Sequence, residues 1–274
     1  MNDLEIKPIP VYSKIIKISN DYYIKYDYRN IILLNSSLKR ISFLEFKNSS
    51  LKVFLLNDGK IIAVSSGLIT IFKVENKEFK KIQEITYEVY DPNEIIELKN
   101  NKILILDSKK LIILKKNNEE YKIEHIIKVE FLSAQIEYIM DNKILLLENK
   151  DLYALDFSEV NFKKQKLNLN LNITQIHKKC MFKIKNNIII FVTDKYLHFY
   201  NLKNEEVISV YAMDGRMTDL ITFKDDSYLC CFPRHKKIFL TTFDNEFIIK
   251  ESKSFDYSRA SGKIYLVNNK LFII

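Results

Sequence analysis

Residues 95–106 read IIELKNNKILIL, which is an apolar strand, a polar turn and a second apolar strand. The same pattern returns at 54–64, 136–147, 181–192, 220–232 and 264–274, with a weaker copy at 15–26. Alternation of short apolar runs with turn residues is typical of β-hairpins. The chain is therefore predicted to consist of repeated hairpins, spaced roughly forty residues apart.

Each turn contains a polar anchor that tolerates a positive φ, as tight hairpin turns require. The seven anchors are Asp21, Asp58, Asn101, Asn142, Asn187, Asp226 and Asn269. After each hairpin come a third strand and a more polar fourth strand, so the predicted unit has four antiparallel strands. The first two strands are apolar almost throughout, which predicts that neighbouring units cover both of their faces. We therefore expect an all-β fold, a single seven-bladed β-propeller over residues 1–274.

The last repeat stops after two strands, at Ile274. An apolar strand at that point would leave an open edge, which proteins usually cover. Residues 4–11 (LEIKPIPV) precede the first repeat, and Pro8 and Pro10 restrict them to an outer edge. We expect this N-terminal strand to pair with the C-terminal hairpin and close the ring, which gives the last blade about three strands.

The strand pattern, strand order and period resemble those of WD40-like β-propellers across essentially the whole chain. The repeats are degenerate, because the chain has no Trp, hence no Trp-Asp pair, and no Gly-His pair. The resemblance implies a toroid with a narrow central channel.

Composition limits the classes of function. No apolar run approaches the roughly 20 residues of a membrane-spanning helix, and the N-terminus lacks the pattern of a secretory signal, so no transmembrane segment is expected. Three cysteines are an odd and sparse set, which favours a reducing compartment and a cytoplasmic protein. The net charge of +8 is compatible with binding to nucleic acid. The alternative is that the charge reflects a general compositional bias, because the chain is rich in Lys, Asn and Ile.

No motif for catalysis, cofactor binding or metal binding stands out. The four glycines are isolated from one another, which excludes a P-loop and a Gly-x-Gly-x-x-Gly loop. The four histidines are scattered, and there is no Gly-x-Ser-x-Gly elbow. A zinc site from His177 and Cys180 with Cys230, Cys231 and His235 would need ligands from different blades. The sequence therefore predicts a protein that is not an enzyme and has no cofactor or metal.

In a propeller of this class, the loops between blades and those between second and third strands share one face. Loops on a rigid scaffold commonly carry function, and aromatic, Met and Arg side chains are enriched in the cores of protein interfaces. The predicted partner-binding face comprises Tyr90, Phe131, Met213, Arg216, Arg234, Lys236, Lys237, Tyr257 and Arg259. The alternative is that the aromatic side chains cover the ends of the blades and the charges are solvated.

These observations favour a non-catalytic scaffold that mediates protein–protein interactions within a larger, multi-subunit assembly. The alternative is docking on RNA or a ribonucleoprotein, in the manner of ribosome-associated propellers, through basic loops such as 234–237. A phosphoinositide-binding propeller is less favoured because the chain lacks an Arg-Arg pair, and an enzyme with a site over the channel is also less favoured.

Overall fold

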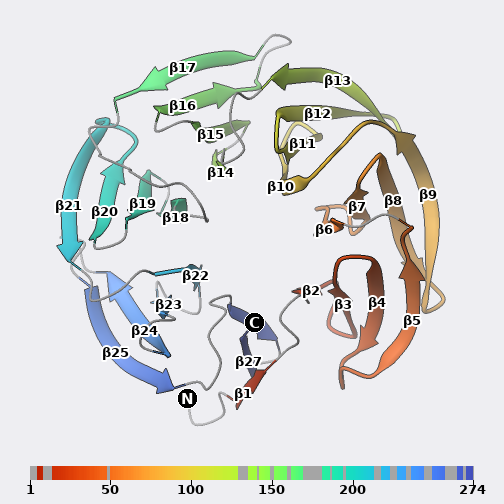
Figure 1. Cartoon of the computed structure of the whole chain (residues 1–274), viewed down its shortest axis with the longest axis horizontal. Coiled ribbons are helices and arrows are strands. Elements are labelled where there is room, and N and C mark those ends of the chain that lie inside the picture. The colour runs from red at the N-terminus through yellow and green to blue at the C-terminus, as the bar shows by residue number, and fades with distance from the viewer. Residues whose placement is uncertain are drawn as a thin grey trace. The chain divides into compact units, whose positions relative to one another are not determined.

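The computed structural model describes residues 5–8, 14–47, 50–128, 135–140, 142–148, 151–158, 162–168, 181–185, 187–193, 196–212, 217–222, 227–232, 236–243, 249–256, 264–267 and 270–273. In these residues all regular structure is β-strand, arranged in six four-stranded antiparallel sheets and one three-stranded sheet (Figure 1). They include no helix of the length and apolarity needed to span a membrane.

Residues 12–136 form one compact unit with three four-stranded blades. The first blade contains β2 (Lys14–Lys17), β3 (Tyr22–Tyr26), β4 (Asn30–Asn35) and β5 (Arg40–Glu45). The second contains β6 (Lys52–Leu55), β7 (Ile61–Ser65), β8 (Leu68–Glu75) and β9 (Glu78–Thr86). The third contains β10 (Pro92–Glu97), β11 (Lys102–Asp107), β12 (Lys110–Asn117) and β13 (Glu120–Lys128). Strands β6 and β10 contact each other, and β9 contacts both β5 and β13.

Residues 1–11 and 137–274 form the second compact unit. One blade contains β14 (Gln135–Met140), whose first two residues belong to the other unit, with β15 (Lys143–Glu148), β16 (Asp151–Asp156) and β17 (Lys163–Leu167). The next contains β18 (Met181–Lys185), β19 (Ile188–Val192), β20 (Tyr196–Asn201) and β21 (Glu206–Ala212). The following blade contains β22 (Asp219–Thr222), β23 (Ser227–Phe232), β24 (Lys237–Phe243) and β25 (Ile249–Asp256). The three-stranded sheet contains β1 (Glu5–Pro8), β27 (Lys270–Ile273) and β26 (Ile264–Val267).

The described residues form six four-stranded blades. The prediction of seven such blades is therefore wrong. The seventh sheet has three strands because the C-terminal hairpin supplies only β26 and β27. Its third strand is β1, which pairs in parallel with β27 from Glu5↔Lys270 to Pro8↔Ile273. The predicted pairing of the N-terminal strand with the C-terminal hairpin is therefore confirmed, whereas closure of a ring stays a prediction.

Burial is greatest in the second strand of each blade, where strands β7, β11 and β19 are buried at every residue. The first strands are less buried than expected, since β6 has one buried residue and β10 has two, and the rest are half-buried. The reason is that a first strand lies at the edge of its sheet and is flanked on one side only. On the fourth strands β9 and β13, every second residue is exposed in most positions. This agrees with the Lys and Glu content of these strands.

The hairpin turns close as the polar anchors predict. In the β6–β7 turn the N–H groups of Leu56 and Gly59 bond back across the turn, and Gly59 has a φ of 79°. In the β10–β11 turn Leu98 and Asn101 make the equivalent bonds, and Asn101 has a φ of 61°. Glycine and asparagine are the residues that adopt this left-handed conformation at least cost, which explains their recurrence in the repeats.

Candidate functional site

Of the nine residues predicted to form a partner-binding face, the structure describes Tyr90, Lys236 and Lys237. The remaining six lie outside the described residues, namely Phe131, Met213, Arg216, Arg234, Tyr257 and Arg259. Tyr90 belongs to the unit of residues 12–136, and the two lysines belong to the other unit.

The backbone of Tyr90 is held from two sides. On one side the buried carboxylate of Asp107, at the end of β11, accepts hydrogen bonds from the N–H groups of Tyr90 at 3.1 Å and Asp91 at 3.0 Å. On the other side the Ser66 hydroxyl, in the β7–β8 turn, donates to the Tyr90 carbonyl at 3.0 Å. Tyr90 thus stands on a loop that two different blades fix in place.

The residues on either side of Tyr90 hold the loop down. Val89 is buried and accepts a hydrogen bond from the N–H of Gly67, whose φ of 81° suits the tight β7–β8 turn. Pro92 is also buried and begins β10. Buried Val89 and Pro92 therefore anchor the loop on both sides of Tyr90, so that the tyrosine is exposed while the loop is held in place.

Tyr90 is 52% exposed, although its backbone is held from both sides. The ammonium of Lys110 lies 5.3 Å from the centre of its ring and 4.8 Å from the centre of the Tyr87 ring. The hydroxyl of Tyr90 is hydrogen-bonded to Glu88, and this bond raises the pKa of the tyrosine. We call Tyr87, Glu88, Tyr90 and Lys110 the tyrosine patch.

The two described basic residues of the predicted face lie at the start of β24. Lys236 is exposed and has a φ of 52° in the turn before the strand. Lys237 is half-buried and lies opposite Asp256 of β25 in the register of the sheet. Their part in a partner-binding face stays a prediction.

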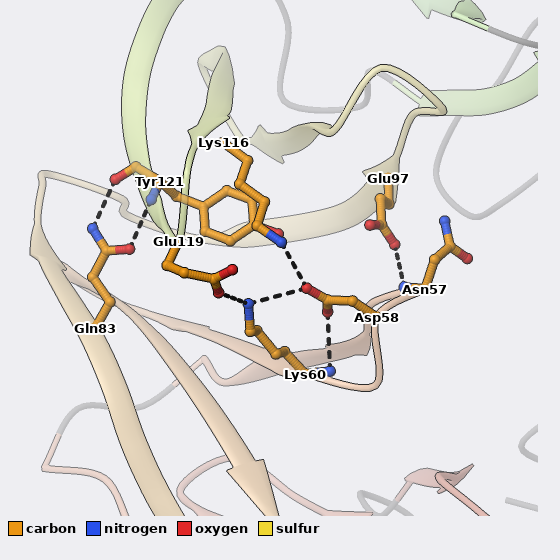
Figure 2. Close-up of polar contacts among 8 residues, drawn as sticks. All are labelled: Asn57, Asp58, Lys60, Gln83, Glu97, Lys116, Glu119 and Tyr121. Atoms are coloured by element: carbon orange, nitrogen blue, oxygen red, sulfur yellow. Dashed lines mark hydrogen bonds and ion pairs between the residues drawn. The ribbon is translucent and has the colours of Figure 1, made fainter.

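A second polar cluster lies at the opposite ends of the strands, where the β6–β7 hairpin meets the β10–β13 blade (Figure 2). The Lys60 ammonium bonds to Glu119 at 2.9 Å and to Asp58 at 3.1 Å, and the Lys116 ammonium bonds to Asp58 at 2.9 Å. Glu97 accepts a hydrogen bond from the N–H of Asn57 at 2.6 Å. These contacts join two blades through charged side chains.

Gln83 joins the same two blades (Figure 2). Its side-chain oxygen accepts from the N–H of Tyr121 at 2.8 Å, and its side-chain nitrogen donates to the Tyr121 carbonyl at 2.7 Å. The amide thereby satisfies both backbone groups of one residue on the neighbouring blade. Sequence patterns did not predict this cluster. Among its residues they singled out Asp58 alone, as the polar anchor of its turn.

The charges in the cluster shift the pKa values of its members. Burial would raise the pKa of Asp58, but the hydrogen bonds from Lys116 and Lys60 outweigh burial and lower it. Burial raises the pKa of Glu97, and the nearby charge of Asp58 adds to the increase. Burial and the same charge raise the pKa of Tyr121 to about 12. Both lysines are engaged by carboxylates, so the arrangement is suited to holding blades together rather than to acid–base chemistry.

Several lysines that form basic clusters in the sequence are paired with carboxylates. On the fourth strand β9, Lys80 pairs with Glu75 at 3.2 Å and Lys81 with Glu84 at 2.8 Å. On the fourth strand β17, Lys164 pairs with Glu148 at 3.3 Å, and Lys166 with Asp151 at 2.9 Å. These strands therefore attract an anionic partner less strongly than their sequence indicates.

The proposed zinc ligands are only partly described. Cys230 and Cys231 are buried cysteines in β23, whereas His177, Cys180 and His235 lie outside the described residues. In the part of the chain that the structure describes, no three His, Cys, Asp or Glu side chains gather in a way that could hold a metal ion.

Comparison with known proteins shows the fold alone. No model of a protein family and no curated protein matches the chain. Among solved structures, it is similar to Sqt1 of Saccharomyces cerevisiae, with 8% identity, a TM-score of 0.66, and coverage of 89% of this chain and 73% of that one.

Two further solved structures are similar. A chain of the mitotic checkpoint complex has 12% identity and a TM-score of 0.66, over 95% of this chain and 82% of that one. U3-55K has 7% identity and a TM-score of 0.65, over 97% of this chain and 89% of that one. These neighbours are WD40-type propellers, so the fold defined by the four-stranded blades is that of a WD40-like β-propeller.

Proposed function

We propose that this chain is a single, non-catalytic β-propeller scaffold of the cytoplasm that binds protein partners through its loop face, with Tyr90 at the centre of contact. The observation that carries the proposal is that Tyr90 is firmly held and yet exposed. Its backbone is fixed by Asp107 and Ser66, and the residue is 52% exposed.

Such a residue is suited to binding because little conformational entropy remains to be lost when a partner covers it. Tyrosine is also among the side chains that most often dominate the energy of a protein interface. The Lys110 ammonium over two rings adds a charge whose position is already set. The tyrosine patch therefore combines apolar area, a hydrogen-bonding hydroxyl and a cation in a small area of the loop face.

The similarity to a chain of the mitotic checkpoint complex supports a role in an assembly, because that propeller is found in a multi-protein complex. The other six residues of the predicted face remain part of the proposal: Phe131, Met213, Arg216, Arg234, Tyr257 and Arg259. Lys236 and Lys237 also remain part of the proposal and would contribute positive charge.

Docking on RNA or a ribonucleoprotein is the second candidate, and the net charge of +8 favours it. The ion pairs on β9 and β17 weigh against it, because they neutralise two of the basic clusters that would contact phosphate. An exposed lysine such as Lys236, for which no ion pair is found among the described residues, would have to supply that contact.

The test is an affinity purification of the tagged chain from its own cells at low salt, with and without nuclease. Three forms are compared: the natural chain, Tyr90→Ala, and Phe43→Ala as a control. Phe43 is a matched control because it is 48% exposed but lies on the fourth strand β5. We expect a fixed set of proteins that survives nuclease, is lost with Tyr90→Ala and is kept with Phe43→Ala.

Partners that disappear on nuclease treatment would replace this proposal with RNA docking. A fixed set of proteins that both variants retain would show that the chain is a scaffold that does not use Tyr90.

A further inference from the structure

Lysines stand directly opposite each other on neighbouring strands four times in the described register. The pairs are Lys73↔Lys80, Lys102↔Lys115, Lys115↔Lys122 and Lys110↔Lys128. Side chains in such positions have their Cβ atoms about 5 Å apart on the same face of the sheet, and like charges there destabilise it. Each pair therefore needs an anion nearby or leaves a repulsion uncompensated.

Two of these pairs are bridged by one carboxylate. Glu75 places one oxygen on Lys73 and the other on Lys80, at 3.2 Å for Lys80. Glu124 does the same for the next blade. Its oxygens lie 2.8 Å from the Lys102 ammonium and 3.4 Å from the Lys115 ammonium. Because Lys115 also stands opposite Lys122, the third pair shares the charge of Glu124.

The pair Lys110↔Lys128 differs from these three. Among the residues that the structure describes, neither lysine has a carboxylate within ion-pairing distance. Lys109, the exposed neighbour of Lys110 in the β11–β12 turn, also lacks one by the same measure. Two acidic groups close by in the sequence are already engaged, since Asp107 accepts from backbone N–H groups and Glu88 from the Tyr90 hydroxyl.

We infer that Lys110 and Lys128 form a binding site for an acidic side chain of a partner protein, which bridges them as Glu75 and Glu124 bridge the pairs within the chain. The inference rests on the proposed function and specifies the chemistry of the partner. The site adjoins the tyrosine patch, because Lys110 belongs to both. The recognised segment carries an Asp or Glu for the two lysines and, beside it, an apolar or aromatic residue for the rings of Tyr87 and Tyr90.

A carboxylate is preferred over a phosphate for two reasons. The internal precedents are both carboxylates that place one oxygen on each lysine. The cation also lies over tyrosine rings in a patch whose other charged member, Glu88, is acidic, and this mixture of charge and aromatic area is typical of protein interfaces. Exposed Asp91 nearby would repel a highly charged phosphate backbone more than a single carboxylate.

The test selects binding peptides from a displayed library of random 12-residue sequences, with the purified full chain as target. The variants are Lys128→Glu, Lys122→Glu and Tyr90→Ala. Lys128→Glu supplies a carboxylate opposite Lys110 from within the chain. Lys122→Glu is the matched control, since it makes the same charge change at an exposed position of the same strand.

We expect the selected peptides to share an Asp or Glu next to an apolar residue. Lys128→Glu should weaken their binding about tenfold or more, because the new carboxylate occupies Lys110 and repels the peptide, while Lys122→Glu should change it little. Lys128→Glu should also raise the urea midpoint of unfolding, because it turns a cross-strand repulsion into an attraction. A gain in stability together with a loss of binding is a result that a merely structural lysine would not give.

Selected peptides without an acidic residue, or acidic peptides that bind Lys128→Glu as tightly as the natural chain, would overturn the inference. So would an RNA oligonucleotide whose binding Lys128→Glu weakens while no acidic peptide is selected. If Tyr90→Ala keeps the peptides and Lys128→Glu releases them, the acidic site stands and docking on Tyr90 fails. The reverse result would keep docking on Tyr90 and remove the acidic site.

Discussion

Asp107 ends β11 and Tyr90 lies in the loop before β10, and the buried carboxylate of the first accepts a hydrogen bond from the backbone N–H of the second at 3.1 Å. The same carboxylate accepts from the N–H of Asp91 at 3.0 Å and from the Ser108 hydroxyl at 3.1 Å. One side chain thus sets the geometry of the loop that presents the tyrosine patch. The position of the exposed ring depends on an acid that the ring does not touch.

Asp107→Ala is expected to destabilise the fold by about 2–3 kcal/mol, because it leaves part-buried backbone donors without their charged acceptor. Asp107→Asn should cost less, since the amide keeps one acceptor oxygen. The measurement is urea unfolding followed by circular dichroism, which suits a chain that has no tryptophan to report by fluorescence. Equal losses for the two variants would contradict the role of the acceptor.

The Asp58 cluster should make stability depend on pH at the acidic end. The pKa of Asp58 is lowered below its ordinary 3.8 in the folded state, because lysine hydrogen bonds outweigh burial. Its contribution is therefore present above about pH 4 and is lost as the pH falls through the folded pKa. Asp58→Asn should lower stability at pH 7 by about 1 kcal/mol or less, given its partial exposure, and should have little effect near pH 2.

Glu97 should act in the opposite direction. Its pKa is raised above the ordinary 4.5, first by burial and then by the charge of Asp58. The folded state therefore holds the proton more tightly, and stability falls as the pH rises from 4.5 through the folded pKa. Glu97→Gln should remove this fall and keep the acceptor for the Asn57 N–H. Unfolding midpoints between pH 4 and pH 7 measure it, and a steeper fall in the variant would contradict the assignment.

Glu124→Gln should be among the most damaging changes of a single charge. The Lys102 side chain is only 6% exposed, and the substitution leaves it beside Lys115 without an anion. Removing one partner of a buried pair costs about 3 kcal/mol or more. The double variant Glu124→Gln with Lys102→Met should recover much of the loss, and a double-mutant cycle on unfolding free energies gives the coupling directly.

Removal of residues 1–8 should destabilise the three-stranded sheet, because β1 is the only described strand paired with the outer edge of β27. An uncovered edge promotes association between chains. The expected result is a lower unfolding midpoint and concentration-dependent aggregation by light scattering. A synthetic peptide of residues 1–11 should restore part of the midpoint when added in excess. A truncated chain that stays monomeric with an unchanged midpoint would show that this pairing contributes nothing.

Local patterns were sufficient to predict the blades. Asp58 with Gly59 and Asn101 mark tight turns, and the apolar runs on either side of them become buried strands. The edge that needs covering at the C-terminus and the two prolines near the N-terminus were enough to predict that β1 pairs with β27. Tyr90 was placed on a partner-binding face because it falls in a loop between blades; the structure shows it exposed, and its role in binding stays a prediction.

The interactions that build the candidate sites depend on distance in space and on register, which local patterns do not contain. Lys60 and Glu119 are 59 positions apart in the chain, and Gln83 and Tyr121 are 38 apart. A bulge between Ile113 and Leu114 shifts the β12–β13 register by one residue. Without the bulge, Ile127 rather than Lys128 would stand opposite Lys110, and the uncompensated lysine pair would not exist.

The parallel pairing of β1 with β27 also has a consequence for biosynthesis. Glu5 pairs with Lys270, so β1 is synthesised well before β27 and must wait for it before the two strands can pair. At elongation rates of about 5–20 residues per second, that wait is on the order of 10–50 s. During this time the blades between them can fold as they emerge, whereas β1 lacks its β27 partner and stays available to chaperones. Completion of this sheet is therefore timed by translation and not by the folding of any single blade.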